Sequence, residues 1–225
     1  RRWLARMSAG SAELQVRALT GVGIVGLIVG AIVCGPWTYG CLLLTVYVIG
    51  VVELTAACRL VTAASPLIFR TGAQLLLLVA FGALAGLSWS DGGYDFWIPL
   101  GWFALMWSND TGAYLVGRKW GRHPLAPTLS PGKTWEGWAG GAVVALLVGG
   151  MLHHNLGAAG SGNWLVLASL VSVFGPLGDV LESLLKRRAG IKDSGQILPG
   201  HGGILDRFDS HLLAAPLALF YLIFA

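Results

Sequence analysis

The stretch from Ser183 to Asp209 concentrates most of the polar chemistry of an otherwise apolar chain. It reads SLLKRRAGIKDSGQILPGHGGILDRFD and lies between two hydrophobic segments, which places it at a membrane surface. Its cations can hold phosphate groups, and its carboxylates can hold a divalent metal ion. This combination beside lipid indicates phosphate chemistry on a lipid substrate. The charged residues and the histidine of the stretch are Lys186, Arg187, Arg188, Lys192, Asp193, His201, Asp206, Arg207 and Asp209.

A second set of polar residues begins inside the preceding hydrophobic segment. Asp179, Glu182, Ser183 and Lys186 have the spacing i, i+3, i+4, i+7, which puts them on one face of a helix. An aspartate buried in a membrane helix needs a partner. We expect that partner to be either a metal ion or the cations of Lys186 and Arg187.

Two further carboxylates, Asp206 and Asp209, are three residues apart at the entry to the last hydrophobic segment. Together with Asp179 they would repel one another unless a cation lay between them. Oxygen ligands of this kind suit Mg²⁺, which keeps open positions for substrate phosphates. The sequence therefore predicts a magnesium site, with room for a second cation of unknown identity. The alternative is a salt-bridge network with the cations Arg187, Lys192 and Arg207.

The middle of the chain carries a basic loop next to a buried acid. Asp110 follows Asn109 late in a hydrophobic segment, and the loop after it contains the triplet Gly-Lys-Thr at 132–134. This triplet is not a P-loop, because the leading glycine of that motif would fall at Pro127 and no strand precedes it. Lys133 and Thr134 at a helix start can still bind phosphate oxygens. The alternative is an ordinary basic loop at a membrane surface.

The composition indicates an integral membrane protein. Of the 225 residues, 55% are hydrophobic and only 12% are charged, whereas soluble domains average about 25% charged residues. A transmembrane helix needs about 20 apolar residues, so the gaps between charges predict about seven spans. These spans are two within 18–52 that fold back at 35–36, one each in 71–90, 96–117 and 210–225, and two within 137–178 that are separated by the polar stretch 153–163.

The basic residues predict the orientation of these spans. Segments 1–17, 59–70, 118–135 and 186–209 hold all 15 Lys and Arg residues, and the alternate loops hold none. Basic loops remain in the cytoplasm. We therefore predict an all-α, polytopic transmembrane bundle with a cytoplasmic N-terminus. It would form a single domain over 1–225, with hydrophobic spans in 1–117 and a catalytic half in 118–225. For the first ten residues, a basic amphipathic surface helix is an alternative.

Four other residues have a less definite meaning. Glu53 is an acid late in the second predicted span, and it is either functional or a hydrogen-bonded residue near the inner surface. Cys34, Cys41 and Cys58 show no metal-binding or redox spacing, and we expect them to be small apolar residues of the membrane domain.

Three motifs resemble one family. The stretch S-x-x-K-R-x4-K-D-x-G-x3-P-x-H-G-G-x-x-D-R-x-D at 183–209 is similar to the signature of the phosphatidate cytidylyltransferases, also called CDP-diacylglycerol synthases. The motifs N-D-x-x-A-Y at 109–114 and S-P-x-K-T-W-E-G at 130–137 also resemble that family. The resemblance covers about the second half of the chain. Asn109 stands where many relatives have serine, and the chain has fewer predicted spans than bacterial members.

The resemblance implies that phosphatidate and CTP react to give CDP-diacylglycerol and pyrophosphate at the cytoplasmic face of the cell (inner) membrane. The implied partners are CTP, phosphatidate and the lipid bilayer. Homodimerisation is left open, and no nucleic acid is expected. The expected catalytic residues are Asp179, Lys192, Asp193, His201, Asp206 and Arg207; the expected substrate-binding residues are Asp110, Ser130, Lys133, Thr134, Lys186, Arg187, Gly202 and Gly203; the expected metal ligands are Asp179, Asp206 and Asp209.

Other functions remain as alternatives. A CTP-dependent lipid kinase or a CDP-archaeol-type synthase would use a related architecture, and the sequence does not resolve the lipid tail. A cation-coupled transporter is a more distant alternative, with Asp110, Asp179 and Glu53 as its intramembrane acids. A transporter does not need the cationic, glycine-rich loop, so the sequence favours the enzymes.

Overall fold

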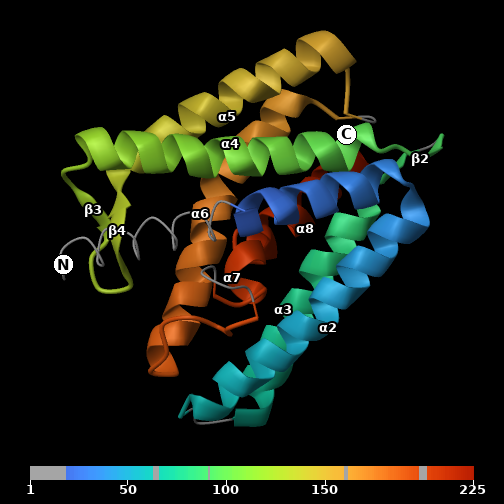
Figure 1. Ribbon diagram of the computed structural model, residues 1–225. Coiled ribbons are helices and arrows are strands. Elements are labelled where there is room, and N and C mark those ends of the chain that lie inside the picture. Colours follow the sequence, from blue (N-terminus) through green and yellow to red (C-terminus); the bar gives the residue numbers. More distant parts are fainter. Residues whose placement is uncertain (1–18, 63–65, 91, 160–161, 198–201) are drawn as a thin grey trace, which may run out of the picture.

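The protein is mainly helical, and its long helices coincide with the predicted hydrophobic segments (Figure 1). The computed structural model describes residues 19–62, 66–90, 92–159, 162–197 and 202–225. Residues 1–17, for which we predicted a cytoplasmic segment or a surface helix, lie outside the described residues. The helices are Leu19–Val33, α2 (Pro36–Leu60), α3 (Pro66–Gly86), α4 (Trp97–Trp120), α5 (Trp135–Leu156), α6 (Trp164–Arg188), the short α7 (Leu205–Phe208) and α8 (His211–Phe224).

Four of these helices, α2, α3, α5 and α6, are long and apolar enough to cross a membrane, as judged over the described part of the chain. The helix Leu19–Val33 and α8 are apolar but shorter. Helix α4 has sufficient length but carries Asn109 and Asp110 in its second half. The fold is therefore that of a helical membrane protein, while the number of seven spans and their orientation stay predictions.

Two short antiparallel hairpins correct the expectation of a wholly α-helical fold. Strands β1 (Trp89–Ser90) and β2 (Gly93–Tyr94) form the first, and strands β3 (Pro124–Ala126) and β4 (Ser130–Thr134) form the second. Proline cannot donate a backbone hydrogen bond inside a helix. The prolines at 124, 127 and 131 therefore exclude a helix between α4 and α5, and the chain extends and folds back instead.

The helices form two connected groups (Figure 1). Helices α2 and α3 pack side by side, and α8 packs against both α3 and α6. Helix α4 packs along α5 and also contacts α6. The core between the groups contains large buried side chains, among them Trp102, Phe103, Trp164 and Phe208. Helix α6 thus contributes to both groups, and the polar residues at its end lie where they meet.

Helix α5 approaches its neighbours closely because its buried face consists of small residues. Gly137, Gly141, Ala145 and Gly149 recur every four residues and are all buried. A Cβ atom on Gly141 would lie 2.6 Å from the backbone oxygen of Asn109 in α4, so a larger residue would push the two helices apart. Small residues at this spacing are typical of close helix pairs in membranes. This packing fixes the polar end of α4 beside the start of α5.

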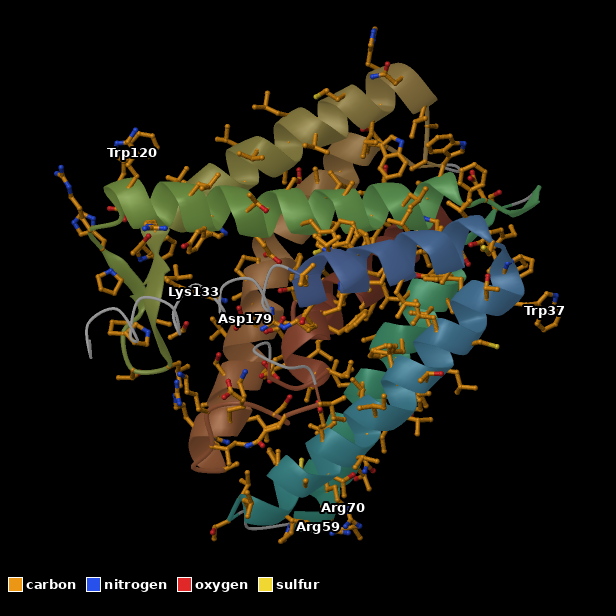
Figure 2. The ribbon with its side chains drawn as sticks, in the orientation of Figure 1. Trp37, Arg59, Arg70, Trp120, Lys133 and Asp179 are labelled. Carbon is orange, nitrogen blue, oxygen red and sulfur yellow. The ribbon has the colours of Figure 1, made fainter. Side chains whose placement is uncertain are left out.

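Labelling from the two sides of the membrane tests the predicted orientation. Figure 2 shows Trp37 at one end of the α2–α3 pair and Arg59 and Arg70 at the other end. In a cysteine-free background, we expect a cysteine at Ala158 to react with an impermeant maleimide from outside only, and a cysteine at Ala189 from inside only. Ala189 is preferable to Gly190, whose φ of 69° disfavours a side chain. Labelling of both positions from the same side would contradict the topology.

Candidate active site

A pocket of about 370 Å³ opens between α4, α5, α6 and the β3–β4 hairpin. Its lining includes groups suited to phosphate or metal binding, namely those of Asp110, Arg118, Lys133, Thr134, Asp179 and Ser210. The pocket therefore brings together the motifs at 109–114 and 130–137, the Asp179 end of α6 and Ser210. Of the predicted site, it collects Asp110, Lys133, Thr134 and Asp179.

The central contact of the pocket is an ion pair between Lys133 and Asp179. The Lys133 ammonium, carried by β4, contacts the Asp179 Oδ2 atom, carried by α6, and Figure 2 shows the two residues beside one another. Both side chains are 27% exposed. The Ser183 hydroxyl donates a hydrogen bond to Asp179 Oδ1 at 3.3 Å. The expectation that Lys186 and Arg187 pair with Asp179 is wrong, because the hairpin supplies a lysine from 46 residues away.

The base of the hairpin is tied to the start of α5, and this fixes the position of Lys133. The Glu136 carboxylate accepts hydrogen bonds from the backbone N–H groups of Arg122 and His123 at 3.1 and 3.2 Å, and it contacts the His123 ring at 2.5 Å. Thr134 caps α5, since its hydroxyl oxygen accepts a hydrogen bond from the Gly137 N–H at 3.1 Å. The prediction of Lys133 and Thr134 at a helix start is confirmed.

A second carboxylate, Asp209, lies close to Asp179. Its backbone packs on α6, because a Cβ atom on Gly178 would lie 2.5 Å from the Asp209 carbonyl oxygen. Burial raises the pKa of the Asp209 carboxyl well above its ordinary value, and the Asp179 and Glu182 carboxylates raise it further. The Asp209 Oδ1 atom accepts a hydrogen bond from the Ser210 N–H at 2.6 Å. Two mutually repelling acids beside the pocket suit a bound cation.

Asp206, in contrast, is bonded to protein donors. Its Oδ1 atom accepts a hydrogen bond from Lys186 at 2.6 Å, and its Oδ2 atom accepts hydrogen bonds from the backbone N–H groups of Ser194 and Gly203 at 3.0 and 2.8 Å. Burial alone would raise the pKa of the Asp206 carboxyl, but the Lys186 ammonium and these N–H donors outweigh it and hold the pKa below its ordinary value. Lys186 also contacts Glu182 Oε2 at 2.7 Å. The contacts of Asp206 and Lys186 therefore hold the loop between α6 and α7 in position.

Glu53 turns out to support the same loop. It is a buried carboxylate of α2 that accepts hydrogen bonds from the Ile204 N–H at 3.1 Å, the Leu205 N–H at 2.9 Å and the Ser194 hydroxyl at 3.1 Å. Two of these donors lie at the N-terminus of α7, which otherwise lacks a side-chain cap. Of the two interpretations left open by the sequence, the structure favours the hydrogen-bonded one.

The remaining predicted site residues that the structure describes do not line the pocket. The side chains of Arg187, Lys192, Asp193 and Arg207 are exposed around the loop. Ser130 begins β4 opposite Ala126 and does not line the pocket. Gly202 has a φ of 79°, and a Cβ atom there would lie 2.8 Å from Asp206 Oδ2, so this position requires glycine. Gly203 donates its N–H to Asp206. His201 lies outside the described residues.

The predicted metal set can be compared with these contacts. Within the ranges that the structure describes, no group of three or more Asp, Glu, His or Cys side chains forms a metal-binding cluster. Asp179 and Asp209 fit a magnesium ion as two neighbouring oxygen donors, since Mg²⁺ commonly uses one or two carboxylates plus substrate phosphates. Asp206 fits less well, because its side chain is only 7% exposed and is held by Lys186, Ser194 and Gly203, whereas the Asp179 side chain is 27% exposed. The metal site itself stays a prediction.

Two contributors had no clear signal in the sequence. Ser194 bonds both Glu53 and Asp206 through its hydroxyl, at 3.1 and 3.0 Å, yet it looked like any serine of a polar loop. His211 is fully enclosed and accepts a hydrogen bond from the Trp102 indole N–H at 3.1 Å. Only the structure reveals the contacts of Ser194 with Glu53 and of His211 with Trp102, because each pair is more than 100 positions apart.

Comparison with known proteins identifies the family. Residues 87–225 match the model of the Cytidylyltransferase family. This segment includes the pocket, the β3–β4 hairpin and the loop before α7. The chain therefore belongs to the Cytidylyltransferase family.

Individual relatives agree with this assignment. The phosphatidate cytidylyltransferase of Bacillus subtilis strain 168 is 50% identical over 119 residues, which cover 52% of this chain and 44% of that protein. The phosphatidate cytidylyltransferase of Staphylococcus epidermidis strain ATCC 12228 is 49% identical over 123 residues, covering 51% and 45%. The chain thus matches less than half the length of these relatives.

Removal of the Glu53 charge tests its role in holding the loop. We expect Glu53→Gln to lower the free energy of unfolding by about 2 kcal/mol, because the amide group loses charge-assisted hydrogen bonds to buried donors. Glu136→Gln is the matched control, since that carboxylate also accepts two backbone N–H bonds but lies at the surface. Thermal unfolding in detergent should show the larger shift for Glu53→Gln. Equal shifts would remove Glu53 from this role.

Proposed function

We propose that this protein transfers CMP from CTP to phosphatidate, giving CDP-diacylglycerol and pyrophosphate. The observation that carries the proposal is the Lys133–Asp179 ion pair, in a pocket that joins the motifs at 109–114 and 130–137 to α6. The membership of the Cytidylyltransferase family and the names of its relatives support the same reaction. The apolar helices around the pocket suit a lipid substrate.

The reaction needs no nucleophile from the protein. A phosphate oxygen of phosphatidate attacks the α-phosphorus of CTP, the bond to the β-phosphate breaks, and pyrophosphate leaves with the electron pair. The phosphate monoester is already ionised near neutral pH, so a strong general base is unnecessary. The protein must bring two polyanions together and stabilise the developing negative charge, which is work for positioned cations and dipoles.

The cations of the pocket and its rim have separate parts in this proposal. Lys133 exchanges its contact with Asp179 for a phosphate oxygen of CTP, because its partly exposed ion pair can be opened at low cost. The exposed side chains of Arg187, Lys192 and Arg207 receive the phosphates of CTP and of the lipid. Lys186 remains with Asp206 and Glu182 and keeps the loop in position.

The expected magnesium ion would be held by Asp179 and Asp209, with Asp110 on the facing wall of the pocket. When bound, the ion neutralises phosphate charge and stabilises the leaving pyrophosphate. A second cation remains part of the proposal, and its identity is open.

We further propose that α4, α8 and the helix Leu19–Val33 span the cell membrane together with α2, α3, α5 and α6, with the N-terminus and the pocket on the cytoplasmic side. This places every Lys and Arg on one side. CTP would then enter from the cytoplasm, while the acyl chains of phosphatidate would remain in the bilayer. Homodimerisation stays open, and no nucleic acid takes part.

The reaction products test the proposed function. Purified protein given phosphatidate, CTP and Mg²⁺ should form CDP-diacylglycerol and release one pyrophosphate for each molecule formed. Thin-layer chromatography of labelled lipid and a coupled pyrophosphate assay measure the two products. Release of CDP with phosphorylation of diacylglycerol or a polyprenol would instead identify a CTP-dependent lipid kinase. An archaeol-type phosphate used in preference to phosphatidate would identify the CDP-archaeol-type synthase.

Two aspartate variants separate catalysis from stability. We expect Asp179→Asn to lower turnover at least 100-fold, because a neutral amide neither holds Mg²⁺ nor balances Lys133, while the melting temperature stays near the wild-type value. Asp206→Asn should lower the free energy of unfolding by about 3 kcal/mol, because it breaks an ion pair whose carboxylate is only 7% exposed. Activity and thermal unfolding are measured for both. Substantial turnover in Asp179→Asn would contradict the assignment.

A further inference from the structure

Helix α6 contains a proline about one turn before Asp179. Pro176 lies inside the helix, and both residues line the candidate active-site pocket. Proline has no backbone N–H, so it cannot donate the helical hydrogen bond to the carbonyl group four residues earlier. That carbonyl belongs to Ser172, a residue that is only 3% exposed. Because a buried carbonyl without a donor is costly, Ser172 needs a donor from outside α6.

The donor comes from α5. The indole N–H of Trp138 donates a hydrogen bond to the Ser172 carbonyl oxygen at 2.8 Å, which is a normal length for such a bond. Trp138 is in the first turn of α5 and lines the same pocket. The bond therefore crosses from the start of α5 to the place where Pro176 interrupts the hydrogen bonding of α6.

This bond joins the two elements that carry the ion pair of the pocket. Lys133 precedes α5 by two residues, and Asp179 follows Pro176 by three. A close backbone approach of α5 and α6 occurs at Gly149, where an added Cβ atom would lie 2.9 Å from the Trp164 carbonyl oxygen. Gly149 is about 16 Å further along α5 than Trp138. At the pocket end, the indole of Trp138 connects the two helices.

We propose that Trp138 is a positioning residue of the proposed reaction, which sets the place of Asp179 relative to Lys133 through its hydrogen bond to the Ser172 carbonyl. Pro176 deprives α6 of one of its own hydrogen bonds next to Asp179, and the indole N–H fixes the helix at that point. A misplacement of about 1 Å can lower a rate about 100-fold. The effect on turnover rests on the proposed function, whereas the effect on the position of α6 can be measured without substrates.

Two substitutions test the hydrogen bond itself. Trp138→Phe keeps an aromatic ring but removes the N–H, and Pro176→Ala supplies a backbone N–H that can donate to the Ser172 carbonyl within α6. We expect Trp138→Phe to lower the melting temperature in detergent by about 4 °C in the otherwise wild-type protein. In the Pro176→Ala background, the same substitution should lower it by about 1 °C or less.

Trp164→Phe is the matched control. It also removes a buried indole N–H, but one that has no partner among the described residues. Trp164 lies about 18 Å before Pro176 along α6. Effects of distant substitutions are additive, so Trp164→Phe should lower the melting temperature equally with proline or alanine at position 176.

Spin labels measure the position of α6 without substrates. Thr128 in the β3–β4 turn and Arg188 at the end of α6 are both exposed and suit nitroxide labels in a cysteine-free background. A bend of about 7° at Pro176 would move the end of α6, about 18 Å away, by about 2 Å. Double electron–electron resonance should show a shift of this size for Trp138→Phe. It should show none for Trp164→Phe, and none when Trp138→Phe is added to Pro176→Ala.

Turnover links the position of α6 to the reaction. We expect Trp138→Phe to lower kcat about tenfold and to change the KM for CTP less than about twofold, because the misplaced Asp179 weakens stabilisation of the transition state. In the Pro176→Ala background, Trp138→Phe should change kcat less than about twofold.

Three results would overturn the proposal. Equal losses of melting temperature in the two backgrounds would show that Trp138 acts through its ring and not through its N–H. An unchanged spin-label distance in Trp138→Phe would show that the bond does not place α6. A shifted distance with a normal kcat would separate Trp138 from the reaction. The first two measurements use neither CTP nor lipid substrate, so they decide the placement of α6 even in a protein that does not transfer CMP.

Discussion

The buried carboxylate of Glu53 is the contact on which the geometry of the loop before α7 depends. A charge inside an apolar bundle is stable only when donors surround it. Here the donors come from Ser194, Ile204 and Leu205. The loop therefore stabilises the Glu53 carboxylate of α2, and the same hydrogen bonds hold the loop against α2. The first half of the chain, which looks like simple hydrophobic spans, thereby positions polar groups of the second half.

The ion pairs around α6 are of two kinds, one buried and one partly exposed. Lys186 is 13% exposed and contacts Glu182 and Asp206, which are nearly inaccessible. Breaking that cluster would leave charges buried without partners. Lys133 and Asp179 are each 27% exposed and face a cavity. Solvent can reach this pair, so the same helix contributes both to a buried charge cluster and to a partly exposed ion pair.

The positions of the long helices were predictable because charge is costly in lipid, and its absence therefore marks each apolar segment. The hairpin was not predicted, although Pro124, Pro127 and Pro131 already argued against a helix there. Helical spacing correctly placed Asp179 near Ser183. It could not give the Lys133 partner, because periodicity reports contacts within one helix and not contacts between elements 46 residues apart.

Glu182 of α6 is linked to the loop before α7 through Lys186. The Oε2 atom of Glu182 contacts Lys186, which contacts Asp206. Asp206 in turn holds the N–H groups of Ser194 and Gly203. A hydrogen-bonded path therefore runs from Glu182 in α6 to the loop. Because Lys186 is shared between Glu182 and Asp206, loss of the Glu182 charge would change the contact that holds Asp206, and the end of α6 and the loop therefore depend on the same lysine.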